Sequence, residues 1–448
     1  MRNARVISLE GIYKINEEDG FSNLVVNTLL NKSNLDKRDR SLATQLIYGV
    51  IRRRNTLDWI INKFASRQVK KMTPWVRNSL RLGVYQVYYL DKIPAPVAVN
   101  ETVEAAKSKC NRGAIKFING VLRNIIRNLD KINYPKLEKD PVQHIRYKYS
   151  QPQWLVERWV KNYGIDKAIE IANNLNKIPA TVIRTNTLKT NRDSLIQSLV
   201  EDQVTAEPIA LVPEAINLIK YPSIDRLKSF EEGKFQVQGL ASMLVAHILA
   251  PEADDRVVDL CSAPGGKTTH LSQLMNNGGQ VYAVDVHQHK LELIHENCTR
   301  LGITNVETIC SDGREVSFTE KIDKLLVDAP CSGLGIMAKK PEIRWQKKPQ
   351  DLLELQQLQA ELLENGAKLL KAGGVLIYST CTFTDEENID IIKGFLEKHD
   401  NFKLVDLSQT AQSFGLTEYL TEGTLQLLPD DNLIEGFFIA KMVKSGNE

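Results

Sequence analysis

The chain has few cysteines, and none of them is spaced as a metal-binding or disulfide framework would require. Its 448 residues include six cysteines without a Cys-x-x-Cys pair, so we expect no metal site. A long apolar run is also missing, because residues 240–250 are interrupted by His247 and are too few to span a bilayer. The N-terminus lacks the apolar core of a signal peptide. These absences favour a globular protein of the reducing cytoplasm with no membrane partner.

Positive charge is distributed unevenly along the chain. The formal net charge is only +3, yet residues 1–135 hold 24 Lys/Arg against 11 Asp/Glu, a net of +13. The remaining residues hold 34 against 44, a net of −10. Because a basic folded block attracts polyanions, we expect the first part to bind nucleic acid. The candidates for phosphate contacts are Arg52, Arg53, Arg54, Lys70 and Lys71, and a merely solvated face is about equally consistent with each of them.

Residues 1–135 show apolar side chains at helical spacing and no strand pattern. Breaks at residues 31–36, 70–74 and 93–96 divide this region into several helices, which predicts an all-α domain. Two prolines follow, and each disfavours helix in the residue before it, so residues 135–150 are predicted to form a linker.

The rest of the chain mixes helix and strand patterns. Residues 145–235 predict a small α+β domain, and residues 236–445 predict an α/β domain with a doubly wound parallel sheet. The predicted strands of that sheet are residues 256–261, 281–286, 306–310, 324–330 and 374–381. Ligands bind such sheets beyond the carboxyl ends of the strands. The residues there are 261–267, Asp285, Asp312, 328–331 and Cys381.

The loop after the first of these strands lacks a glycine that two common nucleotide motifs require. It reads Cys261, Ser262, Ala263, Pro264, Gly265, Gly266 and Lys267. A dinucleotide loop needs G-x-G-x-x-G, and a phosphate loop needs glycine where Cys261 stands. Asp285 could accept from ribose hydroxyls of either a dinucleotide or S-adenosylmethionine, whereas Asp312 could accept from an adenine amino group and favours the methyl donor. Capping roles for these carboxylates and a surface role for Lys267 are the simpler alternatives.

Two of the six cysteines stand at strand ends that flank the expected cofactor crevice. They are Cys331 in DAPC and Cys381 in STC, and Asp328 precedes the first of them. A strand cysteine is usually buried and inert, which is what we expect of Cys298 and Cys310. The shared crevice makes Cys331 and Cys381 candidates for chemistry instead.

Four motifs together, CSAPGGKTTH, DAPCSGLG, KKPEIRW and YSTCT, resemble the bacterial ribosomal RNA cytosine-5 methyltransferases of the Sun/RsmB type. The resemblance extends to YSQPQWLVERWVKNYG and IRTNTL in the middle domain. It also includes a helical first domain similar to the antitermination factor NusB. It implies an RNA-binding first domain, a Rossmann-like class I methyltransferase domain, S-adenosylmethionine as methyl donor and 16S ribosomal RNA as substrate. We expect the enzyme to act as a monomer.

The same resemblance implies the role of each site residue. Carbon 5 of cytosine is too weak a nucleophile to take a methyl group unaided, so a thiolate adds to carbon 6. By resemblance Cys381 is that nucleophile and Cys331 aids product release, an order that spacing alone does not give. Residues 261–267, Asp285, Asp312 and Asp328 would contact the cofactor or its neighbourhood, and Asp328 also suits the amino edge of the base.

The chain departs from the family pattern at a few positions. Gly239 stands where an acidic residue is common, and Thr382 replaces a common serine after the nucleophile. The segment PDDNLIEGFF lacks the usual Pro-His and has Glu435 in place of aspartate. These departures bear on how loops close over the target, not on the thiols.

Two other functions are weighed against this one. A non-catalytic RNA-binding factor would have no need of both thiols and three strand-end carboxylates. A methyltransferase directed at an amino group should carry an Asn/Asp-Pro-Pro-aromatic motif where this chain reads DAPC. The residues present therefore favour methylation of ring carbon 5.

Overall fold

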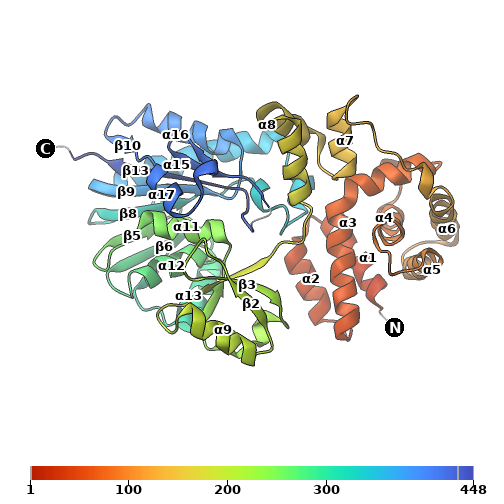
Figure 1. The fold of residues 1–448 in the computed structure, drawn as a ribbon, viewed down its shortest axis with the longest axis horizontal. Helices are drawn as coiled ribbons and strands as arrows, with labels where there is room; N and C mark the ends of the chain where they lie inside the picture. The colour runs from red at the N-terminus through yellow and green to blue at the C-terminus, as the bar shows by residue number, and fades with distance from the viewer. Residues whose placement is uncertain (1–2, 431–432, 447–448) are drawn as a thin grey trace. The chain divides into compact units, whose positions relative to one another are not determined.

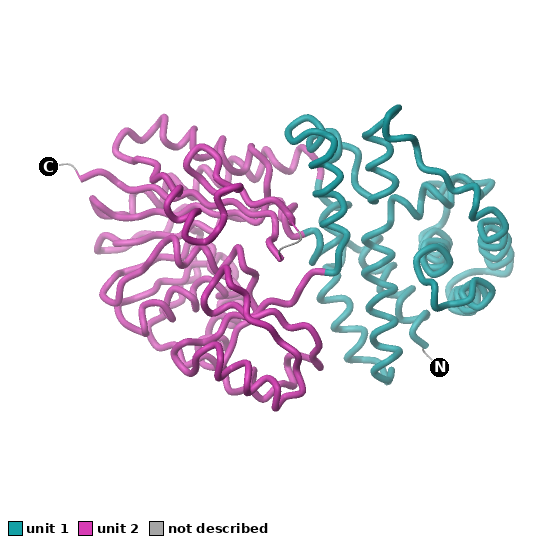
Figure 2. Tube along the Cα trace, viewed as in Figure 1, with its two compact units in different colours: residues 1–178, 337–347 teal, residues 179–336, 348–448 magenta. Residues whose placement is uncertain are grey.

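The computed structural model describes residues 3–430 and 433–446, which form two compact units (Figure 1, Figure 2). One unit consists of residues 1–178 and 337–347, and the other of residues 179–336 and 348–448. The family segment PDDNLIEGFF includes residues 431–432, which lie outside the described residues. Among those described, no helix is both long and apolar enough to cross a membrane.

The described part of residues 1–135 is all-α, as predicted, but the first unit also contains residues 136–178, which were predicted as a linker and as the start of the α+β domain. The unit is built from helices. They are α1 (Ala4–Glu17), α2 (Ser22–Asn31), α3 (Lys37–Phe64), α4 (Pro74–Tyr89), α5 (Ala95–Ala106), α6 (Arg112–Ile126), α7 (Pro141–Lys148) and α8 (Gln153–Asn174), with the short 3₁₀ turn η1 (Val69–Lys71). Apolar residues such as Ile47, Leu80 and Leu122 form one core between α1 and α6. Asp36 and Asn111 cap α3 and α6 by accepting backbone N–H groups.

The predicted linker is partly wrong, because α7 occupies residues 141–148 of it. Proline is favourable at the first position of a helix, where its missing N–H has no partner to lose. Asp140 caps α7 by accepting from the backbone N–H of Gln143 at 3.0 Å. Asn55 and Thr56 of α3 then bond to main-chain carbonyls of this region, so the segment belongs to the helical unit.

The family motif KKPEIRW also lies in the helical unit, although it follows the DAPC strand in sequence. Glu342 accepts from the backbone N–H of Ser22 at 3.0 Å and from its hydroxyl at 2.6 Å. The guanidinium of Arg344 is fully buried and donates to the carbonyls of Leu175 and Met337 and to Asn176. The indole of Trp345 donates to the carbonyl of Ile51 at 2.7 Å. Buried donors of this kind are stable only when paired, so these bonds fix the motif within the helical unit.

A small antiparallel sheet begins the second unit. Its strands lie in the order β2 (Thr205–Pro208), β3 (Ala215–Lys220), β1 (Thr181–Thr185) and β4 (Phe235–Val237). The helices α9 (Arg192–Glu201) and α10 (Lys228–Glu231) accompany it. Ile183, Leu199 and Phe235 share its core, which confirms the predicted α+β class.

Within the described residues, the main sheet has nine strands. The five predicted strands are β5 (Arg256–Asp259), β6 (Gln280–Asp285), β7 (Val306–Cys310), β8 (Ile322–Asp328) and β9 (Leu370–Thr380), and they pair in parallel in the order β9-β8-β5-β6-β7. The prediction omitted an antiparallel extension beyond β9, made of β13 (Phe437–Lys444), β12 (Thr424–Leu427), β11 (Leu420–Thr421) and, beside β13, β10 (Phe402–Leu404). The α/β class is confirmed, and the purely parallel sheet is corrected to a mixed one.

Helices cover both faces of this sheet (Figure 1). The helices α11 (Leu240–Leu249), α12 (Gly266–Leu274) and α13 (Gln288–Leu301) pack on one face, and α15 (Pro349–Leu369) and α16 (Ile389–Leu396) pack on the other. Neighbouring residues of one strand serve opposite faces, as Val257 and Val258 do. The sheet is therefore buried on both sides, and its strand ends are left for binding and chemistry.

Candidate active site

The carboxyl ends of β5, β6, β8 and β9 lie at one edge of the main sheet. Their register aligns Asp259 with Leu326 and Asp328 with Ser379. The structure thus brings together the strand-end residues that the sequence singled out, including both candidate thiols. Parallel strands produce this convergence because every one of them ends at the same edge.

The two candidate thiols lie in direct contact. The Sγ atoms of Cys331 and Cys381 are 3.3 Å apart, and both residues are partly accessible. The hydrogen bond with Cys381 and burial raise the pKa of Cys331 well above its usual value. Such a pair holds one negative charge more easily than two, so Cys331 stays a thiol when its neighbour is a thiolate. The two thiols are close enough to exchange a proton with each other.

A partly buried ion pair lies near the thiols. The Nζ atom of Lys267 lies 2.7 Å from Oδ2 of Asp328, and Oδ1 accepts from the hydroxyl of Ser379 at 2.9 Å. Burial lowers the pKa of Lys267, but the charge and the hydrogen bond of Asp328, together with the nearby Cys381 and Asp259, raise that pKa overall. Lys267 is therefore a fixed cation of the site rather than the surface cation that we considered as an alternative.

The cofactor loop is held in place by its own backbone. The N–H of Ser262 donates to the carbonyl of Val284 at 3.0 Å, and the N–H of Gly265 donates to that of Ser262 at 2.8 Å. Gly265 has φ +93, a conformation that favours glycine. A Cβ atom added at Gly266 would meet nothing within 4 Å, so open space lies above the loop. Burial raises the pKa of the Cys261 thiol, which is consistent with a contact residue that takes no part in chemistry.

The strand-end carboxylates have different surroundings. Asp285 is half-buried at the end of β6 and accepts the backbone N–H of His287 at 2.9 Å, and the Nζ atom of Lys290 lies 3.9 Å from its Oδ1. Asp312 is held by Arg314, whose guanidinium donates to Oδ2 at 2.7 Å, and these bonds lower its pKa. Asp259, which the sequence analysis did not single out, accepts from the hydroxyl of Thr268 at 2.7 Å, and burial raises its pKa to about 7. Asp285 is thus the carboxylate with most capacity left for ribose hydroxyls.

A buried network positions the loop that carries Cys331, and the sequence analysis missed it. Glu387 accepts from the backbone N–H of Ser332 at 2.7 Å and from its hydroxyl at 2.6 Å. The oxygen of the same hydroxyl lies 3.0 Å from Oγ1 of Thr382, next to Cys381, and can accept the proton of that threonine hydroxyl. Gln359 of α15 also donates to Glu387 at 3.2 Å. These bonds tie both cysteine loops together, and the only hint in the sequence is an acidic residue six positions after Cys381.

The predicted RNA-binding residues are placed differently from one another. Arg52 is buried and donates to the carbonyl of Ala338 at 3.0 Å, so its packing gives it a structural role and we withdraw it as a phosphate contact. Arg53 lies over the ring of Tyr89 and is half-buried. Lys70 and Lys71 are exposed, and Arg54 lines a cavity with Lys70. Arg54 and Lys70 are therefore the strongest of the five candidates.

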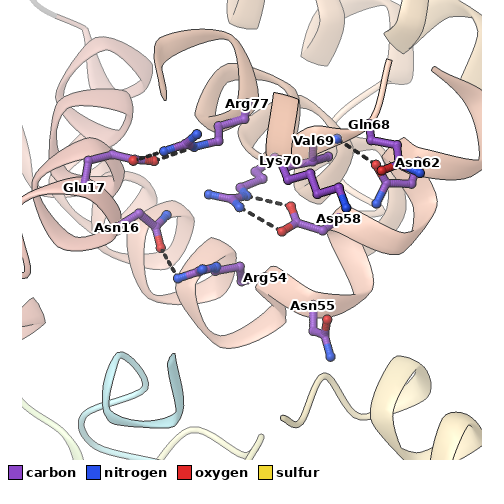
Figure 3. Close-up of a pocket in the computed structure, with 11 residues that line it drawn as sticks. Asn16, Glu17, Arg54, Asn55, Asp58, Asn62, Gln68, Val69, Lys70 and Arg77 are labelled. Carbon is purple, nitrogen blue, oxygen red and sulfur yellow. Dashed lines mark hydrogen bonds and ion pairs between the residues drawn. The ribbon is translucent and has the colours of Figure 1, made fainter. Parts of the chain in front are cut away.

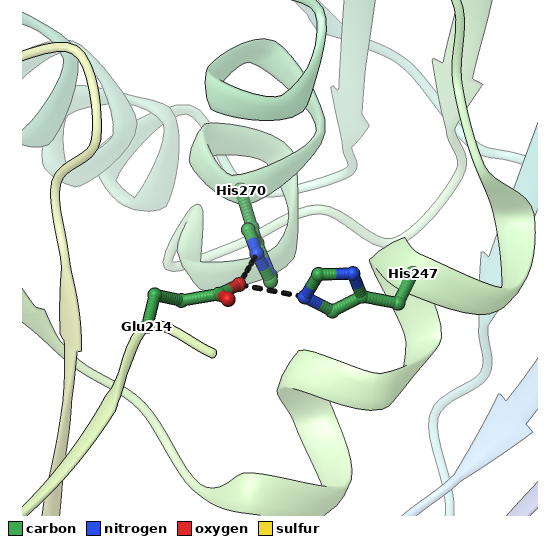
Figure 4. A group of neighbouring side chains, drawn as sticks. All are labelled: Glu214, His247 and His270. Atoms are coloured by element: carbon green, nitrogen blue, oxygen red, sulfur yellow. Dashed lines mark hydrogen bonds and ion pairs between the residues drawn. The ribbon is translucent and has the colours of Figure 1, made fainter. Parts of the chain in front are cut away.

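A second cluster of titratable groups consists of Glu214, His247 and His270 (Figure 4). The Nε2 atoms of His247 and His270 approach Oε1 of Glu214 at 2.7 and 2.6 Å. Atoms of this set could in principle hold a metal ion. Two imidazole nitrogens that share one oxygen at these distances are, however, the geometry of two N–H donors on one carboxylate. We interpret the cluster as a structural hydrogen-bond centre that joins the loop before β3 to α11 and α12.

This cluster predicts a loss of stability in mild acid. Burial and the nearby charge of Arg184 lower the pKa of His270 to about 3, whereas the unfolded value is about 6.5. Between these values only the unfolded chain binds the proton, so the free energy of unfolding decreases as the pH falls below about 6.5. From pH 7.5 to 5.0 we expect this residue to cost about 2 kcal/mol. Urea unfolding of the wild type and of His270→Gln at both pH values measures this cost. The free energy of unfolding of the variant should fall by about 2 kcal/mol less than that of the wild type between pH 7.5 and 5.0.

Asp259 titrates in the opposite sense, since its folded pKa is raised, but it is common to both chains and cancels in the comparison. Equal pH dependence of the two chains would show that His270 is not held neutral by the fold.

Models of known families match nearly the whole chain. The 16S rRNA methyltransferase RsmB/F model matches residues 246–443, the NusB family model matches residues 2–127, and the ferredoxin-like domain of RsmF/B-like methyltransferases matches residues 151–225. The three matches follow the predicted order of a helical, an α+β and an α/β segment.

Individual proteins are similar over the same length. The Bacillus subtilis protein named "Probable ribosomal RNA small subunit methyltransferase B" is 37% identical over 99% of both chains, and the Escherichia coli ribosomal RNA small subunit methyltransferase B is 33% identical over 99% of both. The crystal structure of PH0851 matches 98% of both chains at 30% identity with a TM-score of 0.83. NSun6 from Pyrococcus horikoshii, solved with the S-adenosylmethionine analogue SFG, matches 66% of this chain and 99% of its own at 26% identity with a TM-score of 0.60.

Proposed function

Because the chain belongs to the family of the ribosomal RNA small subunit methyltransferases B, we propose that it forms 5-methylcytosine in 16S ribosomal RNA. The methyl donor is S-adenosylmethionine. The observation that carries the choice of carbon 5 is the contact of Cys331 and Cys381 at 3.3 Å on adjacent strand ends. Addition to carbon 6 needs one thiolate, and release of the product needs a second group beside it.

The residues at the strand ends fit the methyl donor. Open space lies over Gly266, and Asp285 has lone pairs free for ribose hydroxyls. The loop 261–267, Asp285 and Asp312 would hold the donor, which supplies an electrophilic methyl group when bound. The salt bridge of Asp312 to Arg314 would have to loosen or share its acceptor for an adenine contact, which makes Asp312 the weakest of these assignments.

In the proposed reaction the thiolate of Cys381 forms a bond to carbon 6, and the electron pair of the 5,6 double bond makes carbon 5 nucleophilic. Carbon 5 would then take the methyl group from the bound donor, which would leave as a neutral thioether with the electron pair of the broken sulfur–methyl bond. A base removes the proton from carbon 5, the double bond re-forms, and the thiolate leaves carbon 6. The cation of Lys267 and the carboxylate of Asp328 face this chemistry from α12 and β8, where Asp328 suits the amino edge of the base.

Cys331 is suited to be that base because its proton affinity changes during the reaction. In the free site its raised pKa comes first from the hydrogen bond to Cys381. Once Cys381 is bonded to carbon it carries no charge and no longer raises that pKa, so Cys331 becomes easier to deprotonate. Cys331 must first give up its own proton to solvent before it can take the proton from carbon 5, and the uncharged thioether of Cys381 makes that loss easier.

Bisulfite sequencing tests the function directly. We expect one or a few cytosines of 16S ribosomal RNA to resist conversion in cells with the protein and to convert in cells without it. Transfer RNA from the same cells serves as a control for the choice of substrate. Methylation found on an exocyclic amino group by mass spectrometry of nucleosides would contradict the proposal.

The cellular setting is proposed on the same grounds. We propose that the protein acts as a monomer in the cytoplasm, on small-subunit RNA that is free or only partly assembled. The six free thiols fit a reducing compartment, and a cytosine must leave its base stack to reach the thiols.

A further inference from the structure

The helical unit contains a cavity of about 530 Å³ that the thiol site does not use (Figure 3). It lies among α1, α3, η1 and α4, and only one of its lining residues, Val69, is apolar. A polar cavity of this size is unlike the apolar pockets that take most drug-like molecules. Its chemistry points to a charged, hydrogen-bonding ligand.

Two arginines of the cavity are already paired. Arg77 binds both carboxylate oxygens of Glu17, with Nε to Oε1 at 2.8 Å. Arg81 binds both oxygens of Asp58 at 2.7 and 2.8 Å. Bidentate pairs of this kind fix the side chains and neutralise their charges. Glu17 and Asp58 therefore leave the other cations of the cavity uncompensated.

Two cations remain, Arg54 and Lys70. Arg54 donates at 3.3 Å to Asn16 and lies over the ring of Trp345 at 5.4 Å, contacts that use few of its five N–H donors. Burial lowers the pKa of Arg54 to about 10, which still leaves it charged at neutral pH. The structure records no hydrogen bond or ion pair between Lys70 and any described residue. Four cations and two carboxylates thus give the cavity an excess of two positive charges.

Amide groups complete the lining. The side-chain oxygen of Asn62 accepts from the backbone N–H of Val69 at 2.7 Å, which leaves its NH₂ group as a donor. The amide of Gln68 lines the cavity next to it. Amides both donate and accept, so they can pair with the edge of an unstacked base.

We propose that this cavity binds one nucleotide of a single-stranded RNA segment, with its phosphate on Arg54 and Lys70 and its base edge on Asn62 and Gln68. The proposal rests on ribosomal RNA being the substrate and names where the helical unit holds it. An unpaired strand fits best, since a base in a duplex could not offer its pairing edge to the amides.

RNA binding by the full chain without methyl donor tests the proposal. Lys70→Gln and Arg54→Met should each weaken binding of a labelled single-stranded RNA about fivefold and reduce the salt slope of log K by about one. The Met side chain keeps the apolar contact of Arg54 with Trp345, and Lys70 is exposed, so both chains should fold; thermal melting checks this. The control is Arg67→Gln, which removes one exposed charge nearby but outside the cavity, and we expect less than a twofold change.

Competitors separate a nucleotide site from a simple anion site. A nucleoside monophosphate should displace the RNA from the cavity more effectively than inorganic phosphate or polyglutamate does. Equal losses for Arg67→Gln and Lys70→Gln, or equal competition by inorganic phosphate or polyglutamate, would overturn the nucleotide site. Unchanged binding by both cavity variants would overturn it as well.

The outcome is independent of the methylation chemistry. If the wild type makes no 5-methylcytosine but the Lys70→Gln variant binds RNA more weakly than the wild type, the proposed function is contradicted and the nucleotide site in the cavity is supported. If the wild type forms 5-methylcytosine and both cavity variants bind RNA as tightly as the wild type, the proposed function is supported and the nucleotide site in the cavity is contradicted.

Discussion

We expect Cys381→Ala to reduce methyl transfer to RNA by at least about 10⁴-fold, because the variant has no nucleophile to form the carbon 6 bond. Binding of S-adenosylmethionine should stay near the wild-type affinity. The cofactor loop is held by the bonds of Ser262 and Gly265 and not by the thiol. Transfer of a labelled methyl group to RNA and calorimetric titration with the donor measure the two quantities separately.

The matched control is Cys110→Ala, which removes a thiol of the helical unit that has no place in the site. It should keep methyl transfer within about twofold of the wild type. Substantial activity in Cys381→Ala would remove this residue as the nucleophile. If Cys331→Ala were the inactive variant instead, the two roles would have to be exchanged.

The strand ends could be predicted from the sequence because local patterns determine them. Short apolar segments identify parallel strands, and the rule that ligands bind at their carboxyl ends brings residues as distant as Lys267 and Asp328 together. The structure places these two 2.7 Å apart. The distance between Cys331 and Cys381 could not be obtained in this way, because it depends on loops that follow the strands.

Contacts over long sequence separations were not predictable. The antiparallel strand β13 and the KKPEIRW segment in the helical unit both depend on packing of distant parts of the chain. The role of Glu387 is similar, since only the fold brings it to Ser332. Glu387 follows Asp385 and Glu386, and nothing in this acidic run of the sequence indicates that one of the three carboxylates is buried.

Two departures from the family pattern turn out to be neighbours. A Cβ atom added at Gly239 would lie 2.5 Å from the carboxylate of Glu435. The absence of a side chain at one position therefore makes room for the longer acid at the other. The sequence presented these as independent changes, and their proximity accounts for both with one steric argument.

Cys331→Ala should trap the enzyme on its RNA. Without the base that removes the proton from carbon 5, the bond between Cys381 and carbon 6 persists after methyl transfer, and we expect product release to slow by about 100-fold or more. The loop should keep its position, because Glu387 holds Ser332 through its N–H and hydroxyl without help from the thiol. Incubation with RNA and S-adenosylmethionine should give a protein band retarded on a denaturing gel and sensitive to ribonuclease.

The double variant Cys331→Ala with Cys381→Ala provides the control, because it lacks the nucleophile and should give no retarded band. A band that persists in the double variant would show that another residue forms the adduct. Absence of a band in Cys331→Ala, with turnover preserved, would mean that a different group removes the proton. The nearest alternative is then Asp328, which lies on the strand before Cys331 and already accepts from Lys267. The pH profile of the release step, compared between the wild type and Cys331→Ala, would distinguish the two residues. The profile should shift in the variant if the Cys331 thiol is the base, and it should stay unchanged if Cys331 has only a structural role.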